Sequence, residues 1–182
     1  MLFGVRLNIA LILMTITTAA MAQEAIETRG AWRLVADGTD FALRTQAQGA
    51  PDSTLSLVCR KEQQLFAFEI KSPALAGRPS GEDIRIGFKV DDDDQAWLNL
   101  ATGRDGTVPI AQQTAFWIIH AMLMRNGARG VAFTVSDNVW QFALDGLRDL
   151  TAGLAERCGF EPSRGAPERR QQRPSPEPQP PQ

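Results

Sequence analysis

Few side chains in this 182-residue sequence could do acid–base or nucleophilic chemistry. His120 is the only histidine, and it lies in an apolar segment with no acidic residue three or four positions away to orient its imidazole. We therefore interpret it as a core or rim residue rather than a general base. Tyrosine is absent, and no serine stands in a Gly-x-Ser-x-Gly turn. The sequence predicts no catalytic residue, no cofactor-binding residue and no cofactor.

Carboxylates are concentrated in the run Asp91–Asp94, between two predicted strands. Such a run could bind Ca²⁺ and form a Ca²⁺-stabilised structural module, but the spacing of an EF-hand loop fails at Gln95. We interpret the run as a solvated turn and predict no metal ligand. A further alternative is a small carboxylate-dependent envelope hydrolase, because Glu69 and Asp91 stand at strand ends, although their spacing does not favour it.

The only two cysteines are Cys59 and Cys158. In an exported chain an even count indicates a disulfide, because the compartment outside the inner membrane is oxidising. Cys59 shares one face of an alternating segment with Leu55 and Leu57, and Cys158 shares a helix face with three leucines. We therefore predict a Cys59–Cys158 disulfide in the core, which leaves no thiol for nucleophilic catalysis.

Export is predicted from residues 1–22, which read as a signal peptide: Arg6, an apolar stretch over Leu7–Ile16, and a small-x-small cleavage site at Ala20-Met21-Ala22. The apolar stretch is shorter than the ~20 residues that span a bilayer. We expect a periplasmic or secreted protein with no stable membrane anchor after cleavage. Removing Arg6 changes the net charge from −2 to about −3, and no basic stripe suggests nucleic acid as a partner.

The mature chain is expected to fold as one disulfide-closed, β-rich domain over residues 23–160. Side chains alternate between apolar and polar in eight segments, 32–35, 41–45, 55–59, 66–70, 84–90, 96–100, 131–135 and 140–144. Helices are expected at about 111–126 and 146–158, the second with Asp145 as its N-cap. We predict an α+β fold that is mostly antiparallel β, a sandwich or curved sheet of about eight strands with two packed helices.

The composition changes after this domain. Residues 161–182 hold seven of the eleven prolines, mixed with Gln, Glu and Arg and without apolar periodicity. Such a segment cannot bury a core. We therefore expect a disordered, Pro-rich tail that is partly polyproline II.

The first predicted helix is apolar over most of its circumference. One face carries Phe116, Ile119 and Leu123, and nearly the opposite face carries Trp117, Ala121 and Met124. A helix that is apolar on both sides needs two partners, so it is either enclosed within its own domain or docked onto another protein. Trp117, Ala121 and Met124 are therefore candidate partner-binding residues.

Several motifs follow one another in a recognisable order: an early Trp32, the segment Leu57-Val58-Cys59-Arg60, the segment Phe88–Asp91 followed by Trp97, and Phe142–Leu147 followed by Cys158. In this order they resemble the VasI-like periplasmic accessory proteins associated with type VI secretion, over roughly Trp32–Phe160. The resemblance implies an accessory role and no catalytic residues. Together with export and the apolar helix, it suggests a non-enzymatic domain that binds another envelope protein, in a secretion or envelope system.

Overall fold

Alternating side chains build ten β-strands in the computed structural model, which describes residues 24–111 and 113–159. Six of them form one antiparallel sheet in the order β1-β2-β3-β4-β5-β8. Their bounds are β1 Ala25–Arg29, β2 Trp32–Asp37, β3 Asp40–Ala47, β4 Ala50–Arg60, β5 Leu65–Lys71 and β8 Thr107–Ile110. The first five pair in chain order, as expected of a meander with short hairpin connections.

The other four strands form a second antiparallel sheet in the order β10-β9-β6-β7. Their bounds are β6 Asp83–Val90, β7 Ala96–Ala101, β9 Gly130–Val135 and β10 Asn138–Ala143. A 3-10 turn, Pro73–Leu75, lies between β5 and β6. The central pair, β6 and β9, comes from distant parts of the sequence.

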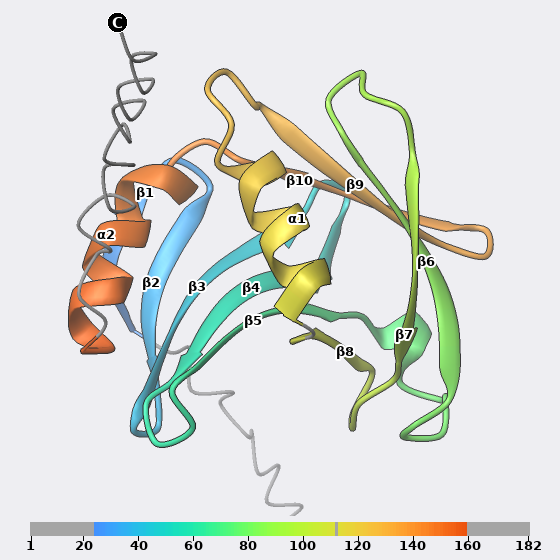
Figure 1. The fold of residues 1–182 in the computed structure, drawn as a ribbon, viewed down its shortest axis with the longest axis horizontal. Coiled ribbons are helices and arrows are strands. Elements are labelled where there is room, and N and C mark those ends of the chain that lie inside the picture. The colour runs from blue at the N-terminus through green and yellow to red at the C-terminus, as the bar shows by residue number, and fades with distance from the viewer. Residues whose placement is uncertain (1–23, 112, 160–182) are drawn as a thin grey trace, which may run out of the picture.

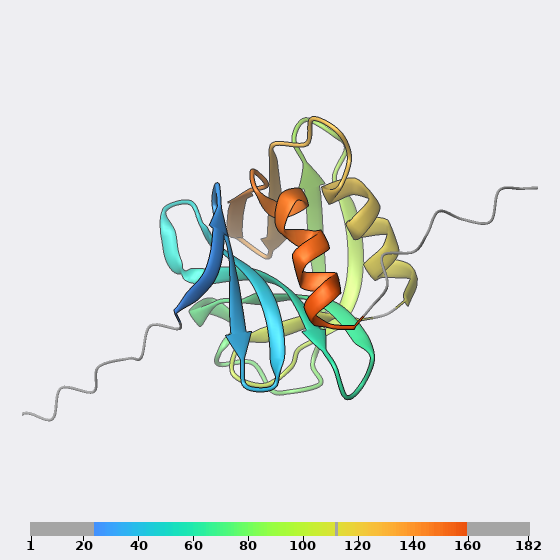
Figure 2. The same cartoon turned by 90° about the vertical axis from the view of Figure 1, so that its left-hand side faces the viewer.

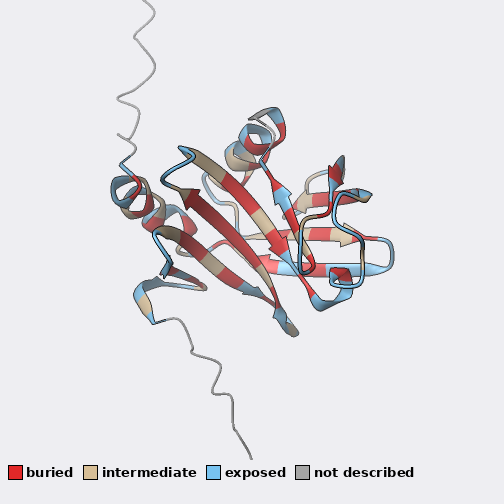
Figure 3. Ribbon diagram, turned by 90° about the horizontal axis from the view of Figure 1, so that it is seen from below, coloured by how far each residue is buried: buried red, intermediate tan, exposed pale blue. Residues whose placement is uncertain are grey.

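The core lies between the two sheets (Figure 1). Figure 3 shows buried positions alternating with exposed ones along the strands, as a sheet with one buried face requires. The largest fully buried side chains come from both sheets: Trp32, Phe68, Phe88, Phe133 and Phe142. The sheets meet where β10 contacts β3 and where β7 contacts β8. The predicted α+β fold, mostly antiparallel β with two helices, is confirmed.

Two helices complete the core. The first, α1 (Gln113–Leu123), lies across the opening between the sheets (Figure 1). Its Phe116 ring stacks on Phe68 of β5 with ring centroids 5.3 Å apart. The second, α2 (Leu147–Arg157), packs against β1, β2 and β3 through three buried leucines. Each helix therefore buries one stripe against the sheets and turns its other side outward.

The count of about eight strands was low, because β1 lacks the alternating pattern and β8 is only four residues long and contains a proline. In β1 the one large apolar residue, Ile26, is exposed, so the strand has no apolar face to detect. In β8 the residue Pro109 interrupts the run, and proline has no N–H to donate to a ladder. Both strands are edges of the six-stranded sheet, where a missing hydrogen bond costs little.

The predicted disulfide is present between Cys59 at the end of β4 and Cys158 just after α2. The start of α2 differs from the prediction. Asp145 is not the N-cap, because Gly146 takes that position with φ of 87° and no side chain caps the helix. A Cβ at Gly146 would lie 1.8 Å from the carbonyl oxygen of Arg29, so this close approach of β1 requires glycine and a positive φ.

Two predicted segments fall outside the described residues: the signal peptide at 1–22 and the Pro-rich tail at 161–182. Within the described part of the chain, neither helix has the length and apolar character needed to cross a membrane.

Candidate functional site

The outward side of α1 carries two of the five large hydrophobic side chains that are exposed among the described residues. Trp117 is 60% exposed and Ile118 is 48% exposed, and Ala121 lies exposed beside them. We call these three residues the α1 outer face. They are exposed because α1 packs its other side, with Phe116, Ile119 and Leu123, against the core. A helix that packs on one side leaves its opposite side toward solvent.

The three residues suggested by the sequence are not equivalent in the structure. Trp117 and Ala121 lie exposed, whereas Met124 is half-buried and packs against the core. Its Sδ lies 3.9 Å from the hydroxyl oxygen of Thr151 in α2, and that hydroxyl donates to the carbonyl of Leu147 at 2.8 Å. Ile118 was missed by the sequence reasoning, although its position on the helical wheel, 100° from Trp117 and away from the core stripe, was available as a signal.

The Trp117 indole is held on one side by neighbouring rings of the same helix. Its ring centroid is 5.2 Å from Phe116 and 5.7 Å from His120, both in edge-on arrangements. The His120 imidazole also stacks on Phe116, and burial lowers the pKa of His120 because a charged imidazole loses solvation there. Burial thus favours the neutral imidazole, and the His120 ring adds an aromatic side to the exposed indole.

Trp97 on β7 is the other exposed tryptophan, but it has a structural role within its own sheet. It is 46% exposed, and the Arg85 guanidinium lies over its ring at 4.6 Å. The ring also covers Gly87 on β6 together with the Gln95 side chain, since a Cβ there would lie 2.0 Å from the Gln95 amide and 3.1 Å from the ring. Exposure alone therefore does not single out Trp117; the difference is that Trp97 covers its own sheet.

The acidic run is only partly a solvated turn. Asp92 and Asp94 are exposed, but the Asp91 carboxylate accepts hydrogen bonds from the backbone N–H groups of Arg129 and Gly130, the latter at 2.8 Å. Asp93 forms an ion pair with Arg125 at 2.9 Å. Asp91 thus fastens the end of β6 to the start of β9, a structural role that does not need a metal.

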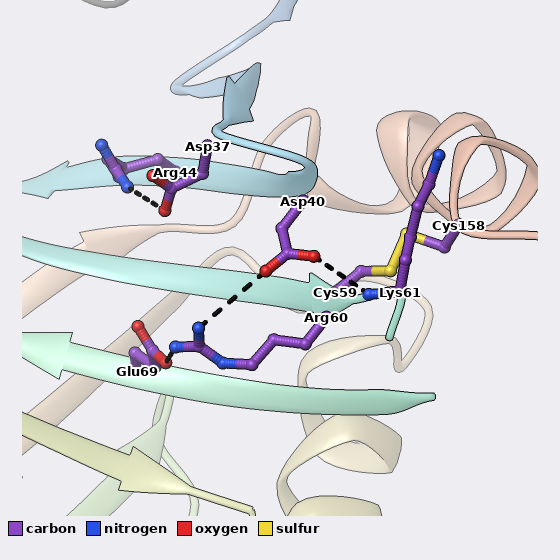
Figure 4. Close-up of polar contacts among 8 residues, drawn as sticks. All are labelled: Asp37, Asp40, Arg44, Cys59, Arg60, Lys61, Glu69 and Cys158. Atoms are coloured by element: carbon purple, nitrogen blue, oxygen red, sulfur yellow. Dashed lines mark hydrogen bonds and ion pairs between the residues drawn. A yellow bond between two sulfur atoms is a disulfide. The ribbon is translucent and has the colours of Figure 1, made fainter. Parts of the chain in front are cut away.

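The other carboxylate considered for hydrolysis, Glu69, also has a partner of its own. It lies on the outer side of β5 and accepts a hydrogen bond from Arg60 at 2.6 Å, which raises the pKa of Arg60 by stabilising its charged form (Figure 4). Glu69 belongs to the six-stranded sheet and Asp91 follows β6 of the other sheet. Glu69 is paired with Arg60, and Asp91 is bonded to the backbone N–H groups of Arg129 and Gly130, so the two carboxylates have different partners on different sheets.

A shallow hollow of about 280 Å³ lies over the outer side of the four-stranded sheet. Lys89, Gln141 and Gln48 line it together with Asp91, whose carboxylate is already bonded to backbone N–H groups. One ammonium group and two amides can hold a polar molecule but offer no nucleophile and base. Among the described residues, no group of three His, Cys, Asp or Glu side chains is placed to hold a metal ion.

Comparison with known proteins adds no assignment. No protein-family model matches the chain, and neither a curated protein nor a solved structure is significantly similar to it.

Proposed function

We propose that this protein is a non-enzymatic domain that works outside the cytoplasm and binds another envelope protein through the α1 outer face. The observation that carries the proposal is the exposure of Trp117 and Ile118 side by side on one helix. Tryptophan is the residue type most enriched at binding hot spots, because its large ring loses much water-exposed area on docking.

The location outside the cytoplasm is supported by two further features. The Cys59–Cys158 disulfide is suited to an oxidising compartment, and residues 1–22 have the pattern of a signal peptide. An accessory role in a secretion or envelope system is the more specific form of the proposal, and it rests on the resemblance to VasI-like proteins.

The test uses the mature protein, immobilised and exposed to an envelope extract of its own cells, with captured proteins identified by mass spectrometry. Once a partner is found, the affinity of Trp117→Ala is compared with that of the unchanged protein. We expect a loss of ~2 kcal/mol or more, which is about a thirtyfold weaker complex.

Trp97→Ala is the matched control, because Trp97 is comparably exposed but lies on the four-stranded sheet. It should leave the affinity unchanged. Equal losses in both variants, or no loss in Trp117→Ala, would contradict binding through the α1 outer face.

A further inference from the structure

One side of α1 turns toward α2, and Trp117 lies on that side. Met124 marks it, because its sulfur contacts Thr151 of α2 at 3.9 Å. Met124 is the first residue after α1, and its N–H still donates to the carbonyl of His120 at 2.9 Å, as in a helical turn. Trp117 precedes it by seven residues, two helical turns, so the two side chains leave the helix in nearly the same direction. The exposed indole therefore faces the region between the two helices.

The two helices run in opposite directions, as Figures 1 and 2 show. Asn126, just beyond α1, hydrogen-bonds Arg148 in the first turn of α2. Met124 and Thr151 are in contact, so they mark the same level along the two helices. Trp117 lies two turns before Met124 and Cys158 lies two turns after Thr151, which is the same direction in space because the helices are antiparallel. Trp117 and the end of α2 thus lie toward the same end of the helix pair.

The disulfide fixes where the chain leaves α2. Cys158 is bonded to Cys59, which pairs with Phe66 of β5 in the six-stranded sheet. Two residues further along β5, Phe68 stacks on Phe116, the residue next to Trp117. The described chain ends at Gly159, one residue after Cys158, so its continuation starts from the end of α2 that corresponds to the Trp117 end of the helix pair.

That continuation has the composition of a ligand for exposed aromatic rings. Twenty-three residues, 160–182, follow Gly159, and five of the eight residues in Pro174–Pro181 are proline. Proline-rich segments bind to aromatic surfaces as preformed polyproline II helices, which lose little entropy on docking. The fifteen residues 160–174 can extend to ~50 Å, whereas the eleven residues of α1 are only ~16 Å long.

From this placement we infer that the segment Pro174–Pro181 covers the α1 outer face of its own molecule and leaves it when the partner binds. Trp117 and His120, with rings edge-on at 5.7 Å, provide the aromatic contact for the prolines. A short tether gives the segment an effective concentration in the millimolar range, so weak contacts suffice. The inference rests on the proposed function for the role of this covering and regulates the same surface.

The test measures the indole N–H signal of Trp117 by NMR in the full mature chain labelled with ¹⁵N. The four tryptophans give four signals, and Trp117→Phe identifies the one required. In one variant the five prolines of Pro174–Pro181 are replaced by Ser; in the control, Pro162 and Pro167 are replaced instead. We expect the Trp117 signal to move in the first variant only, while those of Trp32, Trp97 and Trp140 stay in place.

An unchanged Trp117 signal, or an equal change in the control, would overturn the inference. So would a change that disappears on dilution, because that behaviour indicates the tail of a second copy. A face that is covered about nine-tenths of the time weakens apparent partner affinity about tenfold, so the five-proline variant should bind its partner about tenfold more tightly. If the Trp117 signal moves in the five-proline variant but no partner protein is captured, only the proposed function is contradicted. If a partner binds through the α1 outer face but the Trp117 signal does not move, only this inference is contradicted.

Discussion

The outer side of the six-stranded sheet and the α1 outer face both carry apolar side chains that point away from the core, but only those of the sheet are buried. On the sheet, Val35, Ala42, Val58 and Ala67 pair directly across four strands and form an apolar ladder that points away from the core. All four are buried, and they form a hydrophobic cluster separate from the main core. On α1, Trp117 and Ile118 remain exposed among the described residues.

Ion pairs between charged side chains lie beside the apolar ladder of the sheet and account for its burial. Arg60 and Glu69 lie on opposite sides of the Val58–Ala67 pair and bond across it at 2.6 Å (Figure 4). Arg44 and Asp37 do the same across the Val35–Ala42 pair at 3.7 Å. The aliphatic stems of the arginines cover the small side chains while their charged groups stay in water. The sheet therefore screens its own apolar ladder, whereas α1 leaves a surface available to another segment.

The largest contrast is expected between two tryptophans, one in the core and one on the α1 outer face. Trp32 is fully buried and its indole N–H donates to the carbonyl of Ala143 at 2.9 Å, so Trp32→Ala should cost ~3–5 kcal/mol of unfolding free energy. Trp117→Ala should cost less than ~1 kcal/mol, because most of the ring is already in water. Urea denaturation measures both. A similar loss in the two variants would place Trp117 in the core.

Removing the disulfide should have the next largest effect. The bond joins the end of α2 to β4, and it closes a loop with a sequence separation of 99 residues. Replacing Cys59 and Cys158 together by Ala should lower the unfolding free energy by ~2–5 kcal/mol, because the unfolded chain gains freedom. The measurement is thermal unfolding with and without reductant. Reductant should lower the Tm of the unchanged protein and leave the double variant unaffected; two thiols that alkylate without reductant would contradict the bond.

A smaller effect tests whether ion pairs screen the apolar ladder. Glu69→Ala should cost ~1 kcal/mol, at the upper end for partly exposed ion pairs, because it also uncovers Val58 and Ala67. Glu82→Ala is the matched control, since Glu82 bonds Arg78 at the same 2.6 Å but does not lie over the ladder. It should cost only ~0.2 kcal/mol. Equal losses by denaturant titration would show that the covering contributes nothing.

The smallest effect concerns pH and the half-buried ring beside Trp117. Because burial lowers the pKa of His120 below its ordinary value, the unfolded chain binds this proton more readily than the folded one. The contribution to stability is therefore complete above about pH 6.5 and declines as the pH falls below it. Denaturant midpoints at about pH 7.5 and about pH 5.5 measure it. His120→Gln should show a weaker decline; an identical decline would assign it to other groups.

Much of the local structure could be predicted from the sequence because it depends on periodicity. Apolar residues at every second position identified eight of the ten strands, and leucines three to four residues apart identified α2. The cysteines were placed on core-facing positions of such elements, which is why their pairing could also be predicted. Phe116, Ile119 and Leu123 were likewise recognised as the buried stripe of α1 from their spacing.

Tertiary structure decided what depends on neighbours that are distant in the sequence. The hydrogen bonds of Asp91 reach residues 38 and 39 positions later, and the pairing of β6 with β9 creates them. Met124 and Trp117 have the same position on the helical wheel, yet only Met124 contacts α2, because the helix pair meets at that end. Periodicity fixes which side of an element is apolar, but the packing of the elements fixes which apolar side chains are covered. For α1 that packing buries Ile119 and leaves Trp117 uncovered by the other helix and strands of the described chain.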